Sequence, residues 1–282
     1  MPKIKFKKYH GLGNDYLVID PNVSPIEPTP EVIRSLCHRH FGVGADGILY
    51  GPIKDASNRL HVRIFNPDGS EAEKSGNGLR IFARYLYEAH YVQTQSFAIH
   101  TLGGIVTAHL QDDTGNVIKI EMGTVTFCST DIPTAGPDRQ VVNEALDING
   151  RQYQVTCLSI GNPHCVIPLP EVSESQTKTV GPWVECHPLF PNRINVQFVQ
   201  VIDRHTLDIR IWERGAGYTL ASGSSACAAA AASHKLSLVD SPINVCMPGG
   251  SLRIDINATG LICMTGPVEK VFEGCLMSLP VR

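Results

Sequence analysis

The chain has 282 residues, of which 43% are hydrophobic and 18% are charged, and its formal net charge is −3. The length favours two domains over one, and the hydrophobic content is ample for their cores. The small negative charge gives no electrostatic case for a nucleic acid or an anionic membrane as partner, and no apolar run approaches the roughly 18 residues that a membrane span needs.

The N-terminal residues and the cysteines bear on the cellular compartment. Residues 1–6 lack the apolar core of a signal peptide, so we expect a cytoplasmic protein. The nine cysteines are scattered and form no CxxC pair, which gives no support for a zinc ribbon or a thioredoxin-like redox site. Most lie in apolar runs and are expected to be buried, reduced thiols.

Hydrophobic periodicity and turn residues predict the elements of the first half. In chain order they are strands at 4–9 and 16–19, a helix from Glu31, strands at 48–50 and 61–65, a helix from Ser75 to about Ala89, and strands at 96–110, broken by Gly103-Gly104, and 117–122. Thr29-Pro30 should cap the first of these helices.

The second half shows a similar alternation of strands and helix. In chain order we expect strands at 152–159, 165–168, 195–201 and 207–212, a helix from Ser222 to about Leu236, and strands at 243–247, 251–256, 261–266 and 268–276. The last strand could return to the first sheet.

Two signatures recur in the same order. Asn66 precedes Ser75 by nine positions (75 − 66), and Glu213 precedes Ser222 by nine (222 − 213). Gly13-Asn14 also matches Gly161-Asn162, at an offset of 148 (162 − 14). The repeats predict an internal duplication: an α/β (α+β) fold of two similar lobes, with a ligand cleft expected between them.

The two Ser-Gly helix starts are the first candidates for function. Backbone N–H groups and the positive end of the helix dipole point outward there, which suits a carboxylate. Ordinary N-caps would also explain Ser75 and Ser222, because serine commonly fills that position. The matched residues upstream, Asn66 and Glu213, favour a functional interpretation.

Polar side chains at strand ends and Gly-rich turns form the second candidate set. They are Asn14, Asn66, Asn77, Asn162 and Asn195. A single such asparagine usually makes a local Asx-turn, but five of them across both halves weaken that explanation.

Three further residues leave alternatives open. Glu213 and Arg214 are either a surface ion pair or a site that recognises an amino group and a carboxylate. His164 is either a turn residue or a titrating group. No third glycine completes a dinucleotide motif after Gly11-x-Gly13, and no cluster has metal-ligand spacing, so neither a cofactor nor a metal is expected.

Together these residues resemble the diaminopimelate epimerase family, whose members are cofactor-independent amino-acid epimerases and racemases. The matching blocks are Lys8-x-x-Gly-x-Gly-Asn14-Asp15, Gly42-x-Gly-Ala-Asp46-Gly, Asn66-x-Asp-Gly-Ser-x-Ala-x-x-Ser75-Gly-Asn-Gly-x-Arg80, Gly161-Asn-Pro-His164 and Glu213-Arg-Gly-x-Gly-x-Thr219-x-Ala-Ser222-Gly. They extend over nearly the whole chain.

The resemblance implies two pseudo-symmetric lobes, each a mixed or antiparallel sheet wrapped around a central helix. The lobes would span residues 1–122, with the returning tail 268–282, and residues 123–267. It also implies a small-molecule amino-acid substrate, inverted by Ser75 and Ser222 in the two acid–base positions. If serine needs an activating neighbour there, His164 is the obvious candidate for that supporting role. The implied substrate contacts are Asn14, Asn66, Gly76, Asn77, Asn162, Asn195, Glu213, Arg214, Gly223 and Ser224.

The chain departs from the family pattern at both acid–base positions, where the family has cysteine. A helix dipole can help a thiol to ionise, but an alcohol is far less acidic and needs an activating neighbour. Three hypotheses follow. The first is an epimerase that uses serine chemistry, or one whose two cysteines have been replaced by serine. The second is another isomerase, or a dehydratase of a hydroxy amino acid, and the third is a non-catalytic amino-acid-binding protein. Exposed sheet edges would allow a homodimer.

Overall fold

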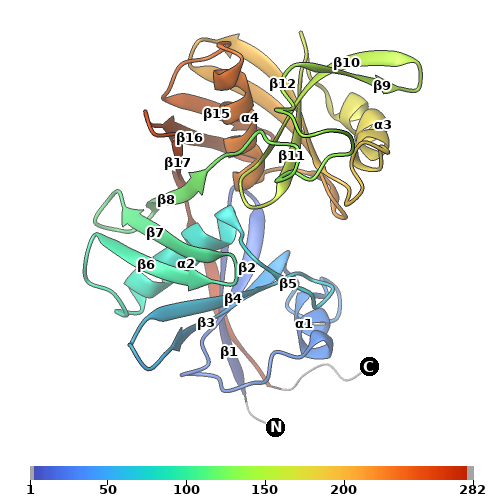
Figure 1. Ribbon diagram of the computed structural model, residues 1–282. Coiled ribbons are helices and arrows are strands. Elements are labelled where there is room, and N and C mark those ends of the chain that lie inside the picture. Colours follow the sequence, from blue (N-terminus) through green and yellow to red (C-terminus); the bar gives the residue numbers. More distant parts are fainter. Residues whose placement is uncertain (1–2, 278–282) are drawn as a thin grey trace. The chain divides into compact units, whose positions relative to one another are not determined.

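A computed structural model describes residues 3–277 of the chain (Figure 1). Contacts between Cα atoms divide the chain into two compact units, one of residues 1–120 with 266–282 and the other of residues 121–265. Each unit mixes strands with helices, which confirms the predicted α+β class.

The first unit is built on a mixed sheet with two helices. Its elements are β1 (Ile4–Gly11), β2 (Asn14–Ile19), α1 (Pro30–Cys37), β3 (Gly47–Lys54), β4 (Leu60–Phe65), β5 (Glu71–Ala72), α2 (Gly76–Glu88), β6 (Ser96–Thr101), β7 (Gly104–Leu110) and β18 (Glu269–Leu276), with β8 (Val117–Thr124) running into the second unit. Strand β18 pairs antiparallel with β1, from Ile4 opposite Leu276 to His10 opposite Glu269. The prediction that the tail returns to the first sheet is therefore confirmed.

The second unit repeats this arrangement. Its elements are β9 (Glu144–Ile148), β10 (Arg151–Ser159), β11 (Pro163–Pro168), α3 (Glu174–Glu185), β12 (Asn195–Asp203), β13 (Thr206–Glu213), β14 (Gly217–Thr219), α4 (Gly223–Lys235), β15 (Ile243–Met247), β16 (Gly250–Ile256) and β17 (Leu261–Pro267).

Strand pairing shows that the duplication covers whole units. In the first, β2 and β3 are parallel, β3 and β4 antiparallel, β4 and β6 parallel, and β6 and β7 antiparallel. The second gives the same sequence of directions for β11, β12, β13, β15 and β16. The repeated spacings around Ser75 and Ser222 thus belong to two copies of one supersecondary unit.

The helices α2 and α4 form the centre of their units. Ten residues of α2 are buried, and so are ten of α4. The run from Ala226 to Ala232, which includes Cys227, is buried throughout, and its small side chains let strands pack closely around the helix. Figure 1 shows each helix among the strands of its own unit.

Thr29 caps α1 as predicted, but helix α3 was missed. Gly181 and Pro182 interrupt its pattern and are typical helix breakers. Gly181 is instead required by packing, because a Cβ atom there would lie 2.6 Å from the Trp212 side chain. The short strands β5, β9 and β14 were also missed.

Candidate active site

Ser75 begins α2 as an N-cap in extended conformation, and its Oγ accepts a hydrogen bond from the Gly78 N–H at 3.1 Å. The first-turn N–H groups of Gly76 and Asn77 cannot be satisfied within the helix, so they are available to an anion. The Ser75 Oγ also lies 3.0 Å from the Tyr16 hydroxyl, which is on β2. The predicted helix start is therefore present, with a phenol as neighbour.

Asn14 and Asn77 are joined by their side chains. The Asn77 amide donates to the Asn14 Oδ1 at 3.0 Å, and the Asn14 amide donates to Asp46 at 3.0 Å. The guanidinium of Arg80, which is fully buried, donates to the Asn77 Oδ1 at 2.9 Å. This chain of bonds fixes both amide orientations relative to Ser75. Asn66 is exposed and donates to Ser70 within its own turn, at 2.9 Å.

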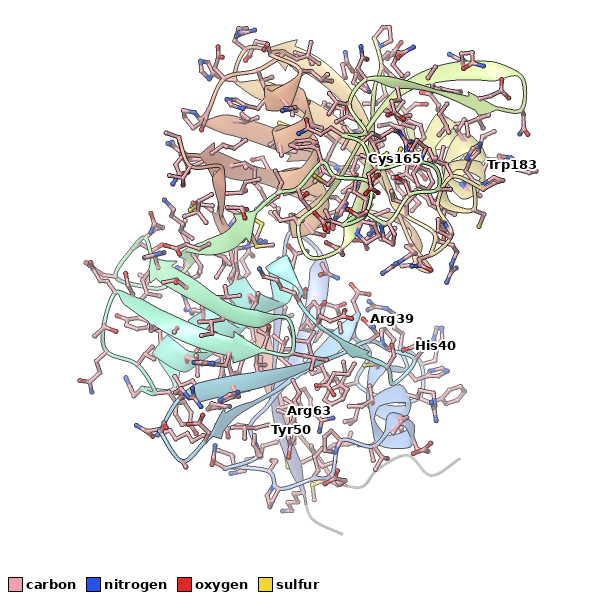
Figure 2. The ribbon with its side chains drawn as sticks, viewed as in Figure 1. Arg39, His40, Tyr50, Arg63, Cys165 and Trp183 are labelled. Carbon is pink, nitrogen blue, oxygen red and sulfur yellow. The ribbon has the colours of Figure 1, made fainter. Side chains whose placement is uncertain are left out.

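A network of ion pairs stabilises the turn that carries Asn14. Asp15 pairs with Lys8 at 2.7 Å and with Arg39 at 2.8 Å, and Arg39 also contacts Asp46 at 2.6 Å. Burial would raise the pKa of the Asp15 carboxyl, but hydrogen bonds from Arg39 and Lys8 outweigh it and lower the pKa to about 2. Figure 2 shows Arg39 in the loop that follows α1.

Ser222 begins α4 in the same conformation as Ser75. Its Oγ lies 3.5 Å from both the Ser225 N–H and the Ser224 hydroxyl. Gly223 and Ser224 occupy the first-turn positions that correspond to Gly76 and Asn77. Ser222 is buried, and the Ser225 hydroxyl behind it accepts a bond from Gln197 at 3.0 Å.

His164 is fully buried, and its Nε2 lies 3.0 Å from the Asn162 Oδ1. Burial lowers the pKa of the imidazole to about 3; the Arg214 charge acts in the same direction, whereas hydrogen bonding to Gln197 opposes it. A neutral imidazole with so low a pKa is a weak base. The structure therefore gives His164 an orienting contact with Asn162.

Asn195 and Arg214 meet at the end of β12. The Asn195 amide donates to the Pro163 carbonyl at 2.9 Å, and its Oδ1 accepts the Arg214 N–H at 3.0 Å. The Arg214 guanidinium donates to the Asn192 carbonyl at 3.2 Å and is largely exposed, while Glu213 beside it is half-buried. Asn162, Asn195 and Arg214 are thus assembled in one region of the second unit.

Glu185, at the end of α3, stabilises the turn that follows β13. Its carboxylate accepts the Trp212 indole N–H at 2.7 Å and the Gly215 N–H at 3.0 Å, and pairs with Arg193 at 3.2 Å. The carboxylate is buried, so its contacts fix the turn that presents Glu213 and Arg214.

A hairpin turn supports the segment before each serine. The Gly103 N–H donates to the Glu73 carbonyl at 3.0 Å, and the Gly249 N–H donates to the Leu220 carbonyl at 2.9 Å. Both acceptors precede their serine by two residues. The same contact therefore recurs in both units.

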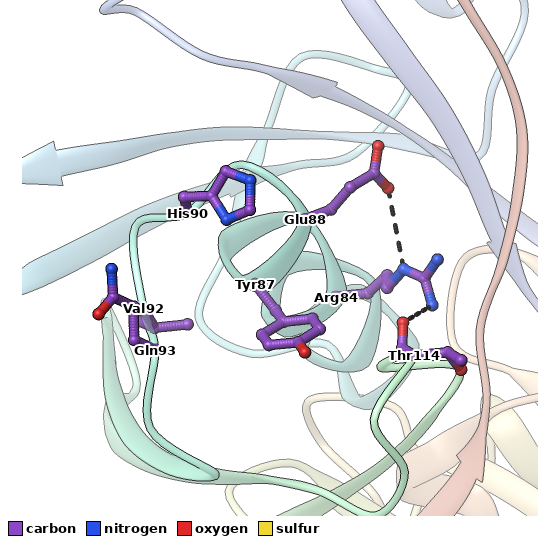
Figure 3. Close-up of a pocket in the computed structure, with 7 residues that line it drawn as sticks. All are labelled: Arg84, Tyr87, Glu88, His90, Val92, Gln93 and Thr114. Carbon is purple, nitrogen blue, oxygen red and sulfur yellow. Dashed lines mark hydrogen bonds and ion pairs between the residues drawn. The ribbon is translucent and has the colours of Figure 1, made fainter.

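A cavity of about 540 Å³ lies elsewhere in the first unit (Figure 3). It is lined by the C-terminal half of α2, including Arg84, Tyr87 and Glu88, and by Thr114. Ser75 is at the opposite end of that helix, so this cavity is separate from the candidate site. Within residues 3–277, no group of three His, Cys, Asp or Glu side chains could hold a metal ion, and no helix is long and apolar enough to cross a membrane.

Comparison with solved structures defines the class of fold. A hydroxyproline epimerase from Agrobacterium vitis, solved with trans-4-hydroxy-L-proline, matches with a TM-score of 0.71 and 13% identity, over 98% of this chain and 91% of the other. A PhzF-family phenazine biosynthesis protein from Bacillus anthracis matches with a TM-score of 0.68 and 15% identity, over 99% and 100%. The chain therefore has the two-unit fold found in these proteins.

The sequence comparisons are more specific. The diaminopimelate epimerase family model matches residues 6–128 and 156–271. "Diaminopimelate epimerase 2" of Nostoc sp. is 53% identical over 96% of this chain and 95% of its own length, and the diaminopimelate epimerase of Moorella thermoacetica is 43% identical over 95% and 98%. The chain belongs to the diaminopimelate epimerase family and is an isomerase.

Sequence reasoning missed three members of the site: Tyr16, Gln197 and Glu185. Tyr16 had a usable signal, since it precedes His164 by the repeat offset of 148 (164 − 16) and each follows a Gly-Asn pair. Gln197 and Glu185 lie inside a buried strand and an unpredicted helix, and no sequence pattern distinguished them.

Proposed function

We propose that this chain inverts the α-carbon of LL- or meso-diaminopimelate, or of a closely related amino acid, without a cofactor, in lysine or peptidoglycan precursor synthesis. Family membership supports the reaction class, and the names of the relatives support the substrate. The observation that carries the proposal is the duplicated helix start, in which Ser75 and Ser222 are each held at the first turn of a buried central helix.

Inversion requires that a proton leave one face of the α-carbon and that another arrive at the opposite face. In the proposal, Ser75 and Ser222 take the two roles in turn. The N–H groups of the residues after each serine bind the reacting carboxylate, where the helix dipole also favours negative charge. These residues are Gly76, Asn77, Gly223 and Ser224.

The remaining proposed contacts select the substrate. Arg214 would bind the distal carboxylate, for which its planar fork is suited, and Glu213 would bind the distal amino group. The asparagines Asn14, Asn66, Asn162 and Asn195 would orient the chain between the two ends, and His164 would hold Asn162. A dehydratase of a small hydroxy amino acid would have little use for the pair Glu213-Arg214, which disfavours that alternative.

We also infer a cytoplasmic location and a homodimer. All nine cysteines are free thiols, as expected in a reducing compartment. Val271 and Phe272 on β18 are 50% and 44% exposed, and such apolar side chains could meet a second copy. Sedimentation equilibrium would decide between monomer and dimer.

The test is solvent deuterium incorporation. LL-diaminopimelate is incubated with the protein in deuterated water, and the α-proton signal is followed by NMR. The parent is compared with Ser75→Ala, Ser222→Ala and the double variant Ser75→Cys/Ser222→Cys.

We expect exchange and formation of the meso isomer by the parent, and loss of both with either alanine. Exchange by the double-cysteine variant alone would mean that the site binds substrate but that serine cannot do the chemistry. Binding without exchange by any form would favour a non-catalytic binder. If no form binds or exchanges diaminopimelate, the substrate assignment is wrong.

A further inference from the structure

The contact between Tyr16 and Ser75 has no counterpart in the reasoning from sequence. Their oxygens are 3.0 Å apart, and either can be the donor. The Ser75 Oγ already accepts the Gly78 N–H at 3.1 Å, so its hydroxyl proton is free to point at the phenol. Tyr16 is only 7% exposed. The two hydroxyls therefore meet with little bulk water around the phenol.

The Tyr16 ring fits in this position because the residue opposite it is a glycine. Tyr16 on β2 lies beside Gly47 on the parallel strand β3. A Cβ atom at Gly47 would be 2.5 Å from the Cε1 of Tyr16 and 2.7 Å from the Phe65 carbonyl. The ring therefore packs across a position that only glycine can occupy, which fixes the direction of the hydroxyl.

Serine needs such a neighbour if it is to act as an acid or a base. An aliphatic hydroxyl is activated in enzymes by an adjacent group that exchanges protons with it. A phenol ionises near pH 10, far more readily than an aliphatic alcohol. His164 is a poor candidate for this function, because burial lowers the pKa of its imidazole to about 3 and its Nε2 contacts Asn162.

We infer that Tyr16 is the proton-transfer partner of Ser75, an inference that rests on the proposed function. When Ser75 acts as base, the α C–H bond breaks and its proton moves to the Ser75 Oγ. The hydroxyl proton of Ser75 moves at the same time to Tyr16, which has lost its own proton to water beforehand, and the electron pair of the broken bond stays on the substrate carbon. The negative charge thus passes from Tyr16 to the α-carbon.

Ser75 acts as the acid when Ser222 has removed the proton from the other face of the α-carbon. Ser75 gives its proton to the carbanion and takes the proton of the Tyr16 hydroxyl, which leaves a phenolate. No free Ser75 alkoxide forms in either direction. Two protons move in each step, one between the α-carbon and Ser75 and one between Ser75 and Tyr16, and water is the only further reactant.

The two units are unequal in this respect. His164 occupies the position of the second unit that matches Tyr16, and it contacts Asn162. The Ser222 Oγ lies instead near Ser224 and the Ser225 N–H. Among the described contacts, a phenol therefore lies beside Ser75 of the first unit and not beside Ser222 of the second.

The test combines Tyr16→Phe with Ser75→Cys. Phenylalanine keeps the ring that packs against Gly47 and removes only the hydroxyl. A thiol ionises without the help of a phenol, so it should make Tyr16 dispensable. Four proteins are compared by α-proton exchange in deuterated water: the parent, each single variant, and the double variant.

In the protein that has Ser75, we expect Tyr16→Phe to slow α-proton exchange about 100-fold, which is in the range of general acid–base effects. In the Ser75→Cys background the same change should cost less than about threefold, since the phenol no longer takes part. Tyr50→Phe is the matched control, because Tyr50 on β3 then loses a hydroxyl that donates to the Ile26 carbonyl. Figure 2 shows Tyr50 in the first unit.

Two outcomes would overturn the inference while the proposed function stands. Equal losses in both backgrounds would make Tyr16 a packing residue, and an unchanged Tyr16→Phe rate would make it a bystander. An inactive parent would instead reject the serine chemistry itself, and the inference with it. Circular dichroism and thermal unfolding of all four proteins separate these results from misfolding.

Discussion

The main-chain N–H of Gly103, at the tip of the β6–β7 hairpin, donates to the carbonyl of Glu73 at 3.0 Å. A Cβ atom on Gly103 would lie 2.9 Å from that oxygen, so the hairpin tip must be glycine to approach the chain so closely. The contact fixes the backbone two residues before Ser75.

Gly103→Ala should therefore displace the segment that carries Ser75. Forcing an extra methyl group into a tight contact costs about 1–3 kcal/mol. We expect a lower melting temperature and at least about tenfold slower substrate exchange, because a small misplacement of an acid–base group is expensive. Leu102→Ser is the control, since Leu102 is 67% exposed at the same tip. Unchanged exchange by Gly103→Ala would show that the contact does not position Ser75.

Glu185→Ala should weaken substrate binding, although Glu185 itself is not among the proposed substrate contacts. It leaves the half-buried Trp212 indole N–H and the exposed Gly215 N–H without their acceptor, at a cost of about 0.5–1.5 kcal/mol for each hydrogen bond. The turn that carries Arg214 then loosens, so KM for diaminopimelate should rise more than kcat falls. Arg193→Met removes only the exposed partner of Glu185 and should leave KM near the parent value. Equal effects of the two variants would contradict the positioning role.

The buried imidazole of His164 should make stability depend on pH. Its pKa is lowered to about 3 in the folded protein and is near 6.5 when unfolded. Between these values the unfolded chain binds more protons, so stability falls as pH decreases from about 6.5, by up to about 1.4 kcal/mol per pH unit. Urea unfolding of the parent and His164→Gln from pH 7 to 4 measures the difference. A His164 ring that titrates near pH 6.5 by NMR would refute the prediction.

The Asp15 carboxylate should make stability depend on pH in a lower range than His164 does. Its folded pKa of about 2 lies below the ordinary value near 3.9, so its stabilisation is present above about pH 4 and is lost as pH falls towards 2. The loss should be about 2 kcal/mol. Asp15→Asn should be less stable than the parent at pH 7 and should lack this part of the acid transition. Parallel acid-unfolding curves for the two proteins would argue against it.

Much of the architecture could be predicted from local patterns. The Ser-Gly starts at Ser75 and Ser222 predicted both central helices, and their equal spacing predicted the duplication. The tail at 268–276 was predicted to be a strand, which the structure shows as β18. Helix α3 could not be found in this way, because Gly181 is explained only by its packing against Trp212.

The candidate site was less predictable than the fold. The sequence motifs pointed to Asn14, Asn77, Asn162 and Asn195 as candidates, but they did not point to the residues that contact them in the structure. The contacts of Tyr16 with Ser75 and of Glu185 with Gly215 join residues 59 and 30 positions apart in the chain. Hydrogen bonds over such separations depend on tertiary structure, which composition and periodicity do not report.

The serine at the start of each central helix also determines which chemical damage the site can suffer. A cysteine thiolate in this position is open to peroxide, which converts it stepwise to sulfenic, sulfinic and sulfonic acids. An alcohol oxygen has no such series of products, and it is not alkylated by reagents that depend on a thiolate. Ser75 and Ser222 would therefore survive oxidative stress unmodified, and the slower chemistry of oxygen would be accompanied by tolerance of oxidants.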